Sequence, residues 1–170
     1  MPPKLAPLNV MGGAHTESIW CCAWGGTATN SLLVTGGADA VVGVWELGQD
    51  GALRIKHKLT SQGLQLGVVS VAASPSGLVA ASSMHSRITV FDGDAEVLQL
   101  NPNAGEVWGI AFEPGDAPRH LAAASGAAGG VAMYRVNGGD GDQQTPACVY
   151  SLPKAVSILY IIAIQYFRFI

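Results

Sequence analysis

Short apolar runs separated by turn-forming residues fill most of this chain and predict β-strands. The runs are rich in Val, Ile, Leu and Ala, and Gly, Pro, Asn, Asp or Ser stands between many of them. The predicted strands are residues 19–24, 32–36, 41–45, 53–59, 68–73, 78–83, 87–91, 96–100, 107–112, 120–125, 130–136 and 147–152.

These runs form three units with the same internal order. Each unit has an apolar strand, a strand of small residues, a strand that ends in an aromatic residue, and an outer strand. The units begin 49 and 39 residues apart, and their closing aromatic residues, Trp45, Phe91 and Tyr134, lie 46 and 43 residues apart. Four short strands in about 40–45 residues are typical of one blade of a β-propeller. We therefore expect an all-β fold, a partial propeller of three four-stranded blades.

The repeat divides the chain into five segments. We expect a lead-in over residues 1–13, blades over 14–60, 61–101 and 102–153, and an atypical hydrophobic tail over 154–170. A closed propeller usually has about four to eight blades, so we expect further blades in polypeptide outside this sequence. The tail fits the truncated start of a fourth blade or a misread C-terminus. A membrane anchor is disfavoured, because the uncharged run of the tail is shorter than the ~17–25 residues that span a bilayer.

Turn residues place the loops between the strands. Residues 25–30 read Gly-Gly-Thr-Ala-Thr-Asn and predict a loop, and residues 38–40 predict a tight turn. Ser-Pro-Ser-Gly at 74–77 has the proline and glycine positions that a tight turn favours. Residues 137–145 predict a further, Gly- and Asp-rich loop. Between these turns, the small residues of the strands allow neighbouring blades to approach closely.

Composition excludes several functional classes. The chain is 49% hydrophobic and 12% charged, which indicates a packed core, and its net charge of −3 argues against direct nucleic-acid binding. The three cysteines make no disulfide framework and favour a reducing compartment. The first residues lack the apolar core of a signal peptide. We expect a protein of the nucleus and cytoplasm, with no membrane partner.

Sequence motifs for metals or cofactors are absent. His57, His85 and His120 do not have metal-ligand spacing, and no Cys-x-x-Cys occurs. The glycine pairs match neither a phosphate loop nor a dinucleotide fingerprint. We expect no metal, no cofactor, no small-molecule substrate and no enzymatic activity.

One constellation in the first unit combines four polar or aromatic residues, His15, Thr35, Asp39 and Trp45. A turn aspartate can fix one imidazole nitrogen, the other nitrogen can engage a hydroxyl, and the indole N–H needs an acceptor. The alternative is a hydrolase triad, which is disfavoured because no strained nucleophile turn or oxyanion loop accompanies these residues.

The first unit resembles the repeats of WD-repeat proteins. Those repeats open with Gly-His and close with Trp-Asp, and this unit has Ala14-His15 and Trp45-Glu46. The resemblance implies that His15, Thr35, Asp39 and Trp45 form the structural hydrogen-bond network of the family, which ties a loop to the sheet.

The other two units depart from this pattern. Gly63-Leu64 stands at the opening pair of the second unit and His85 at its turn aspartate, while the third unit closes with Tyr134-Arg135. We therefore expect the network in the first blade only, and packing in the other two.

Within this family the chain resembles the WD-repeat subunit shared by the superkiller RNA-decay complex and the RNA polymerase II-associated factor complex. The stretches that carry this likeness are residues 14–25, 65–71 (Gln-Leu-Gly-Val-Val-Ser-Val), 80–83 and 107–114. The resemblance implies the N-terminal half of a non-catalytic adaptor that docks protein subunits of those complexes in mRNA decay and transcription elongation. The alternatives are a WD-repeat adaptor of another pathway, such as a ubiquitin ligase or a trafficking complex, and, less favoured, a propeller hydrolase.

We expect partner proteins to dock on the face of the molecule where the first strand of each unit begins. Trp20, Val69 and Trp108 occupy equivalent places there, and aromatic residues at a rim are typical anchors for a partner peptide. The alternative is that these side chains pack between blades.

Overall fold

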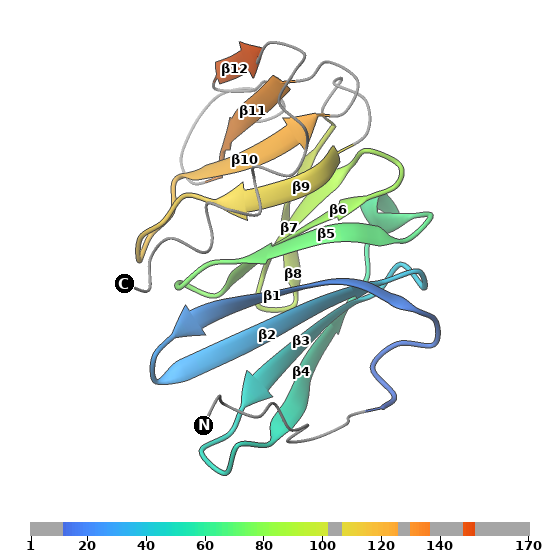
Figure 1. Cartoon of the computed structure of the whole chain (residues 1–170), viewed down its shortest axis with the longest axis vertical. Coiled ribbons are helices and arrows are strands. Elements are labelled where there is room, and N and C mark those ends of the chain that lie inside the picture. The colour runs from blue at the N-terminus through green and yellow to red at the C-terminus, as the bar shows by residue number, and fades with distance from the viewer. Residues whose placement is uncertain (1–11, 102–106, 126–129, 137–147, 152–170) are drawn as a thin grey trace, which may run out of the picture.

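Three four-stranded antiparallel sheets make up the computed structural model, which describes residues 12–101, 107–125, 130–136 and 148–151 (Figure 1). Within these residues there is no α-helix, and a short 3₁₀ helix, η1, spans Gln62–Leu64. Sequential strands pair within each sheet, so every sheet is a meander. The strands are β1 Ile19–Thr27, β2 Asn30–Gly37, β3 Val42–Leu47, β4 Leu53–Leu59, β5 Val68–Ala73, β6 Leu78–Ser83, β7 Ile88–Asp92, β8 Ala95–Leu100, β9 Val107–Phe112, β10 His120–Ser125, β11 Gly130–Arg135 and β12 Cys148–Ser151.

The three sheets stack as sectors of a ring. Strand β1 contacts β5 and β5 contacts β9, and these three strands lie side by side across the molecule, while β4 and β12 lie at its outside (Figure 1). We call the sheets blade 1 (β1–β4), blade 2 (β5–β8) and blade 3 (β9–β12). This arrangement confirms the expected all-β fold, a partial β-propeller.

Two apolar layers hold the blades together. Blades 1 and 2 enclose one layer, whose fully buried members include Val34, Val42, Leu64, Val68 and Phe91. Blades 2 and 3 enclose the other, which includes Ile88, Leu100, Val107, Leu121 and Tyr134. Each fully buried side chain of this kind contributes roughly 1.5–3 kcal/mol relative to an exposed one. Contact between blades therefore supplies much of the core.

Two glycines lie in β1, although the sequence predicts a loop over residues 25–30. Strand β1 continues through both of them. A Cβ atom on Gly25 would clash with the Cβ and the backbone of Ala73 in blade 2. The N–H of Gly26 donates to the carbonyl of Ser74 in blade 2 at 3.1 Å. The loop prediction is therefore wrong at Gly25 and Gly26. These glycines lie in a strand, where they allow the sheets of blades 1 and 2 to approach closely.

The remaining strands begin and end within two residues of their predicted bounds. The helix η1 was not predicted. Ser61 caps it by accepting a hydrogen bond from the N–H of Gly63, and Leu64 enters the apolar layer between blades 1 and 2. Most of the expected lead-in, the loop over 137–145 and the hydrophobic tail over 154–170 lie outside the described residues. In the described part of the chain, no helix is long and apolar enough to cross a membrane.

Candidate protein-docking surface

A β-bulge occurs at the same place in the first strand of every blade. The pairing register skips one residue between β1 and β2, between β5 and β6, and between β9 and β10. The skipped residues are Trp20, Val69 and Trp108, which are the three residues expected to dock a partner. A bulge leaves one residue outside the ladder and redirects its side chain. Each blade therefore offers one apolar side chain at an equivalent position.

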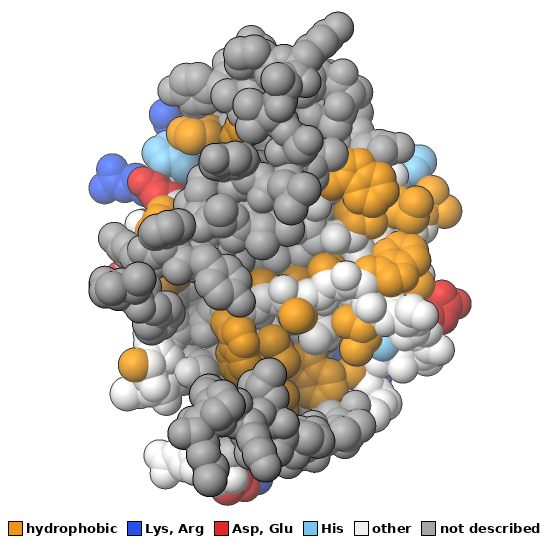
Figure 2. All heavy atoms as spheres, viewed as in Figure 1, with side chains coloured by type: hydrophobic (Ala, Val, Ile, Leu, Met, Phe, Trp, Pro, Cys, Tyr) orange, Lys and Arg blue, Asp and Glu red, His pale blue; other side chains and the backbone are white. Residues whose placement is uncertain are grey.

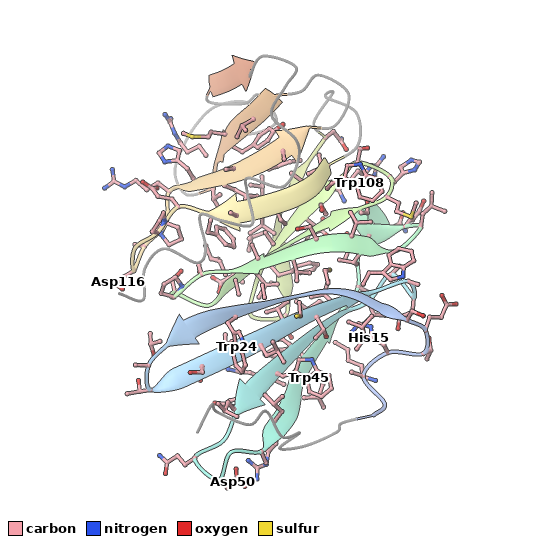
Figure 3. The ribbon with its side chains drawn as sticks, viewed as in Figure 1. His15, Trp24, Trp45, Asp50, Trp108 and Asp116 are labelled. Carbon is pink, nitrogen blue, oxygen red and sulfur yellow. The ribbon has the colours of Figure 1, made fainter. Side chains whose placement is uncertain are left out.

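The two bulge tryptophans are partly open to solvent. Trp20 is 47% exposed and Trp108 is 43% exposed, while Val69 is half-buried. Leu66 and Met84 are also exposed. Figure 2 shows hydrophobic side chains gathered on the right-hand edge of the molecule, and Figure 3 places Trp108 at that edge. We call these five residues the bulge surface.

Left-handed backbone at Leu66 and Gly67 shapes this surface. Leu66 has a φ of +66°, which is uncommon for a residue with a side chain, and it is 66% exposed. Gly67 has a φ of +94°, and a Cβ atom there would lie 2.5 Å from the Trp20 ring. Glycine at 67 therefore lets the Trp20 ring lie against the backbone that precedes blade 2. Strained backbone of this kind is concentrated at functional sites.

A small open pocket adjoins two of the bulge residues. Its cavity volume is about 10 Å³, room for roughly one water molecule, and it is lined by Val69, Ser83, Met84, Val107 and Trp108. Four of these five residues are apolar. The pocket lies where blade 2 meets blade 3, so it depends on the packing of the two blades.

The structure brings together His15, Thr35, Asp39 and Trp45 in blade 1. Nδ1 of His15 lies 2.9 Å from Oδ1 of Asp39, and Nε2 lies 2.9 Å from Oγ1 of Thr35. The indole N–H of Trp45 donates to the same Thr35 oxygen at 3.0 Å. The His15 and Asp39 side chains are only 2% and 6% exposed. The network therefore links the segment before β1 to the β2–β3 turn and to both of those strands.

The turn aspartate is held as a carboxylate. Burial raises the pKa of Asp39, but the hydrogen bonds that it accepts from His15, Thr16 and Val41 outweigh burial and keep the pKa below its ordinary value. A carboxylate can only accept, so we assign a proton to Nδ1 of His15. In the neutral ring, Nε2 then accepts the hydroxyl proton of Thr35.

Gly43 provides the space that the network occupies. A Cβ atom there would lie 2.7 Å from Oγ1 of Thr35 and 3.1 Å from the indole nitrogen of Trp45. In blade 2 the register places Ala81 and Thr89 opposite each other, as Thr35 and Gly43 are in blade 1. The hydroxyl of Thr89 is buried without a hydrogen-bond partner among the described residues. Blade 2 thus has packing where blade 1 has the network.

The hydrolase interpretation does not fit the geometry of these side chains. Thr35 is buried, and its hydroxyl oxygen is already within hydrogen-bond distance of His15, Trp45 and the carbonyl of Gly43. That oxygen therefore takes part in contacts within the protein rather than facing solvent. Among the described residues, no three His, Cys, Asp or Glu side chains are grouped so that they could hold a metal ion.

Sequence reasoning missed three residues of this region. Leu66 lies in the Gln-Leu-Gly-Val-Val-Ser-Val stretch, and its left-handed backbone was not apparent from the sequence. Met84 lies in a turn, where an apolar residue is a weak signal of exposure. Ser83 ends a run of small residues, Ala80 to Ser83, that predicts only close packing of the blades.

No protein-family model matches the sequence. Among curated proteins, the chain is 37% identical to the WD repeat-containing protein VIP3 of Arabidopsis thaliana over 136 residues, which are 77% of this chain and 40% of VIP3. It is 33% identical to the WD repeat-containing protein SL1-17 of Schistosoma mansoni over 106 residues, 59% of this chain and 34% of that protein. The matches thus cover about two fifths and one third of these relatives.

The fold and the relatives agree on one class of protein. Over the matched residues the chain is similar to WD repeat-containing proteins, and its stacked four-stranded blades are consistent with that likeness.

Proposed function

We propose that this protein is a non-catalytic adaptor that binds segments of partner proteins on the bulge surface. The observation that carries the proposal is the set of three bulges, which place Trp20, Val69 and Trp108 at equivalent positions of consecutive blades. Tryptophan is among the residues that contribute most to protein interfaces. Two half-exposed tryptophans on the first strands of blades 1 and 3, with β5 of blade 2 between those strands, are therefore suitable anchors.

The proposed partners are subunits of the superkiller RNA-decay complex and of the RNA polymerase II-associated factor complex. Support comes from the resemblance of residues 65–71 to the subunit shared by these complexes. The same stretch contains Leu66, Gly67 and Val69, which build the bulge surface. We propose action in mRNA decay and transcription elongation, and a location in both nucleus and cytoplasm.

The proposal can be tested by affinity purification of the tagged 170-residue chain from cells. The wild-type chain is expected to recover tetratricopeptide-containing subunits of either complex. Trp20→Ala and Trp108→Ala should each reduce this recovery, because truncating a central tryptophan typically costs at least about 2 kcal/mol, roughly thirtyfold in Kd.

Trp24→Ala is the matched control. Trp24 lies on the same strand as Trp20 and is 59% exposed, but it is outside the bulge surface and lies well away from Trp108 (Figure 3). Equal losses from Trp20→Ala and Trp24→Ala would contradict the proposed surface. Recovery of a ubiquitin-ligase or trafficking complex would reassign the pathway and leave the adaptor role in place.

A further inference from the structure

Leu66 combines an unfavourable backbone conformation with an exposed apolar side chain. Its φ of +66° lies in the left-handed region, where a bulky residue is an outlier. Its side chain is 66% exposed, the largest exposed fraction among the exposed large hydrophobic residues that the structure describes. The left-handed backbone lowers the stability of the folded chain, and burial of so exposed a side chain offsets little of that loss.

The blade repeat does not require this conformation. The other described non-glycine residues with positive φ are Ala40, at +60°, and Ser86, at +61°. They lie in the β2–β3 turn of blade 1 and in the corresponding β6–β7 turn of blade 2, so a shared turn geometry accounts for both. Leu66 precedes β5 by two residues, whereas Glu17, two residues before β1, does not have a positive φ. The left-handed residue thus occurs in the link to blade 2 and not at the matching place in blade 1.

The residues around Leu66 hold it in a defined position. Leu64 and Val68, two residues to either side, are fully buried. The carbonyl of Gly67 accepts a hydrogen bond from the N–H of Met84 at 3.1 Å, which fixes the link to the β6–β7 turn. The Leu66 side chain is therefore presented to solvent from a backbone that is anchored before and after it.

A structural role for leucine does not explain these observations. If the turn alone mattered, glycine or asparagine would adopt the positive φ at a lower cost. If the apolar side chain stabilised the free protein, it would be buried, as that of Leu64 is. An outlier of this kind at an exposed position is a reason to look for a function.

We propose that Leu66 is a further anchor of the docking surface, and that its side chain binds an apolar residue of the partner segment. The inference rests on the proposed docking function and identifies one residue that determines its specificity. The Trp20 ring lies against the backbone of Gly67, the residue next to Leu66, so a segment that covers this ring also reaches the Leu66 side chain. An aliphatic or aromatic partner residue fits, because the contact removes apolar surface of both residues from water.

The test uses dodecapeptides selected on phage against the full 170-residue chain. Peptides that lose binding to Trp20→Ala serve as probes, and fluorescence anisotropy measures their affinity for each variant. Leu66→Asn should weaken binding about tenfold, because it removes the apolar contact. Leu66→Met keeps an apolar side chain and should bind within about threefold of the wild type.

Thermal unfolding separates the anchor role from a structural one. Asparagine tolerates the left-handed region better than leucine, so Leu66→Asn should keep the Tm of the wild type or raise it by up to about 4 °C. Two control variants lie outside the bulge surface. Ala40→Gly relieves the same kind of backbone conformation, and Val97→Asn removes an apolar side chain that is 52% exposed. Both should leave the peptide affinity unchanged.

The outcomes separate the two proposals. Probe peptides that bind Leu66→Asn as tightly as the wild type would overturn the anchor role of Leu66 alone. A lower Tm for Leu66→Asn would overturn it as well, because leucine would then stabilise the free protein. A selection that yields no peptide dependent on Trp20 or Trp108 would overturn the docking surface itself.

Discussion

Blades 1 and 2 have the same strand order and pairing but are stabilised by different chemistry. Blade 1 ties its β2–β3 turn to the sheet through a buried network that ends on Asp39. Blade 2 has His85 at the equivalent turn, an exposed residue, and fills its interior with Ala81 and Phe91. The comparison shows that the blade fold requires the apolar layers, whereas the polar network is an addition that one blade can lack.

The largest difference between the blades should appear when the turn residue is removed. Asp39→Ala would leave His15 and the N–H groups of Thr16 and Val41 without their acceptor. We expect a loss of about 3 kcal/mol in the free energy of unfolding, measured by urea denaturation. His85→Ala should change it by less than about 0.5 kcal/mol, since His85 is on the surface. Similar losses of unfolding free energy from Asp39→Ala and His85→Ala would contradict the proposed difference between blades 1 and 2.

A smaller loss is expected when a side chain is added inside the network. Gly43→Ala places a Cβ atom 2.7 Å from the Thr35 hydroxyl and should cost about 2 kcal/mol. Thr89→Ala, the counterpart in blade 2, removes a hydroxyl that has no described partner and should cost less than about 1 kcal/mol. Thermal unfolding of the two variants measures both losses of stability. A larger loss from Thr89→Ala than from Gly43→Ala would contradict the proposed difference between the blades.

Acid should remove the contribution of Asp39 selectively. Because the pKa of Asp39 is lowered in the folded protein, its stabilising effect is fully present above the ordinary carboxyl pKa of about 3.9 and is lost as the pH falls through the folded-state value. The difference in unfolding free energy between wild type and Asp39→Asn should therefore narrow below about pH 4. A constant difference down to pH 2 would show that the carboxylate charge does not matter.

The smallest expected effect is a difference in alkylation rate between two neighbouring cysteines of β1, one partly buried and one exposed. Burial raises the pKa of the Cys21 thiol to about 12, and its sulfur lies 3.6 Å from the carbonyl oxygen of Val68 in blade 2. Cys22, the next residue, is exposed. Iodoacetamide at pH 8 should modify Cys22 well before Cys21, as followed by peptide mass spectrometry. Equal rates would mean that blades 1 and 2 separate in solution.

The sequence carried most of the fold because strand periodicity and turn residues are local signals. The twelve strands and the three-blade repeat follow from them. Gly25 was misassigned because its role is set by Ala73, which lies 48 positions away and meets it only when the blades stack. Local sequence does not report such a contact.

The candidate site was predictable in part. Equivalent positions in the repeat were enough to select Trp20, Val69 and Trp108 as a set. Their bulges depend on the register with the neighbouring strands, which alternation of apolar residues does not fix. The hydroxyl of Ser83 makes no hydrogen bond to a described residue and is buried where blade 2 meets blade 3, which has no signature in the sequence.

Site-specific photocrosslinking tests the docking surface most directly. A benzoylphenylalanine placed at Met84, on the bulge surface, is compared with one at Ile55, on the outer strand β4; the two native side chains are exposed to a similar degree. We predict crosslinks from position 84 to the proteins that copurify with the chain, and few from position 55. Crosslinks from position 55 with none from position 84 would contradict the docking surface.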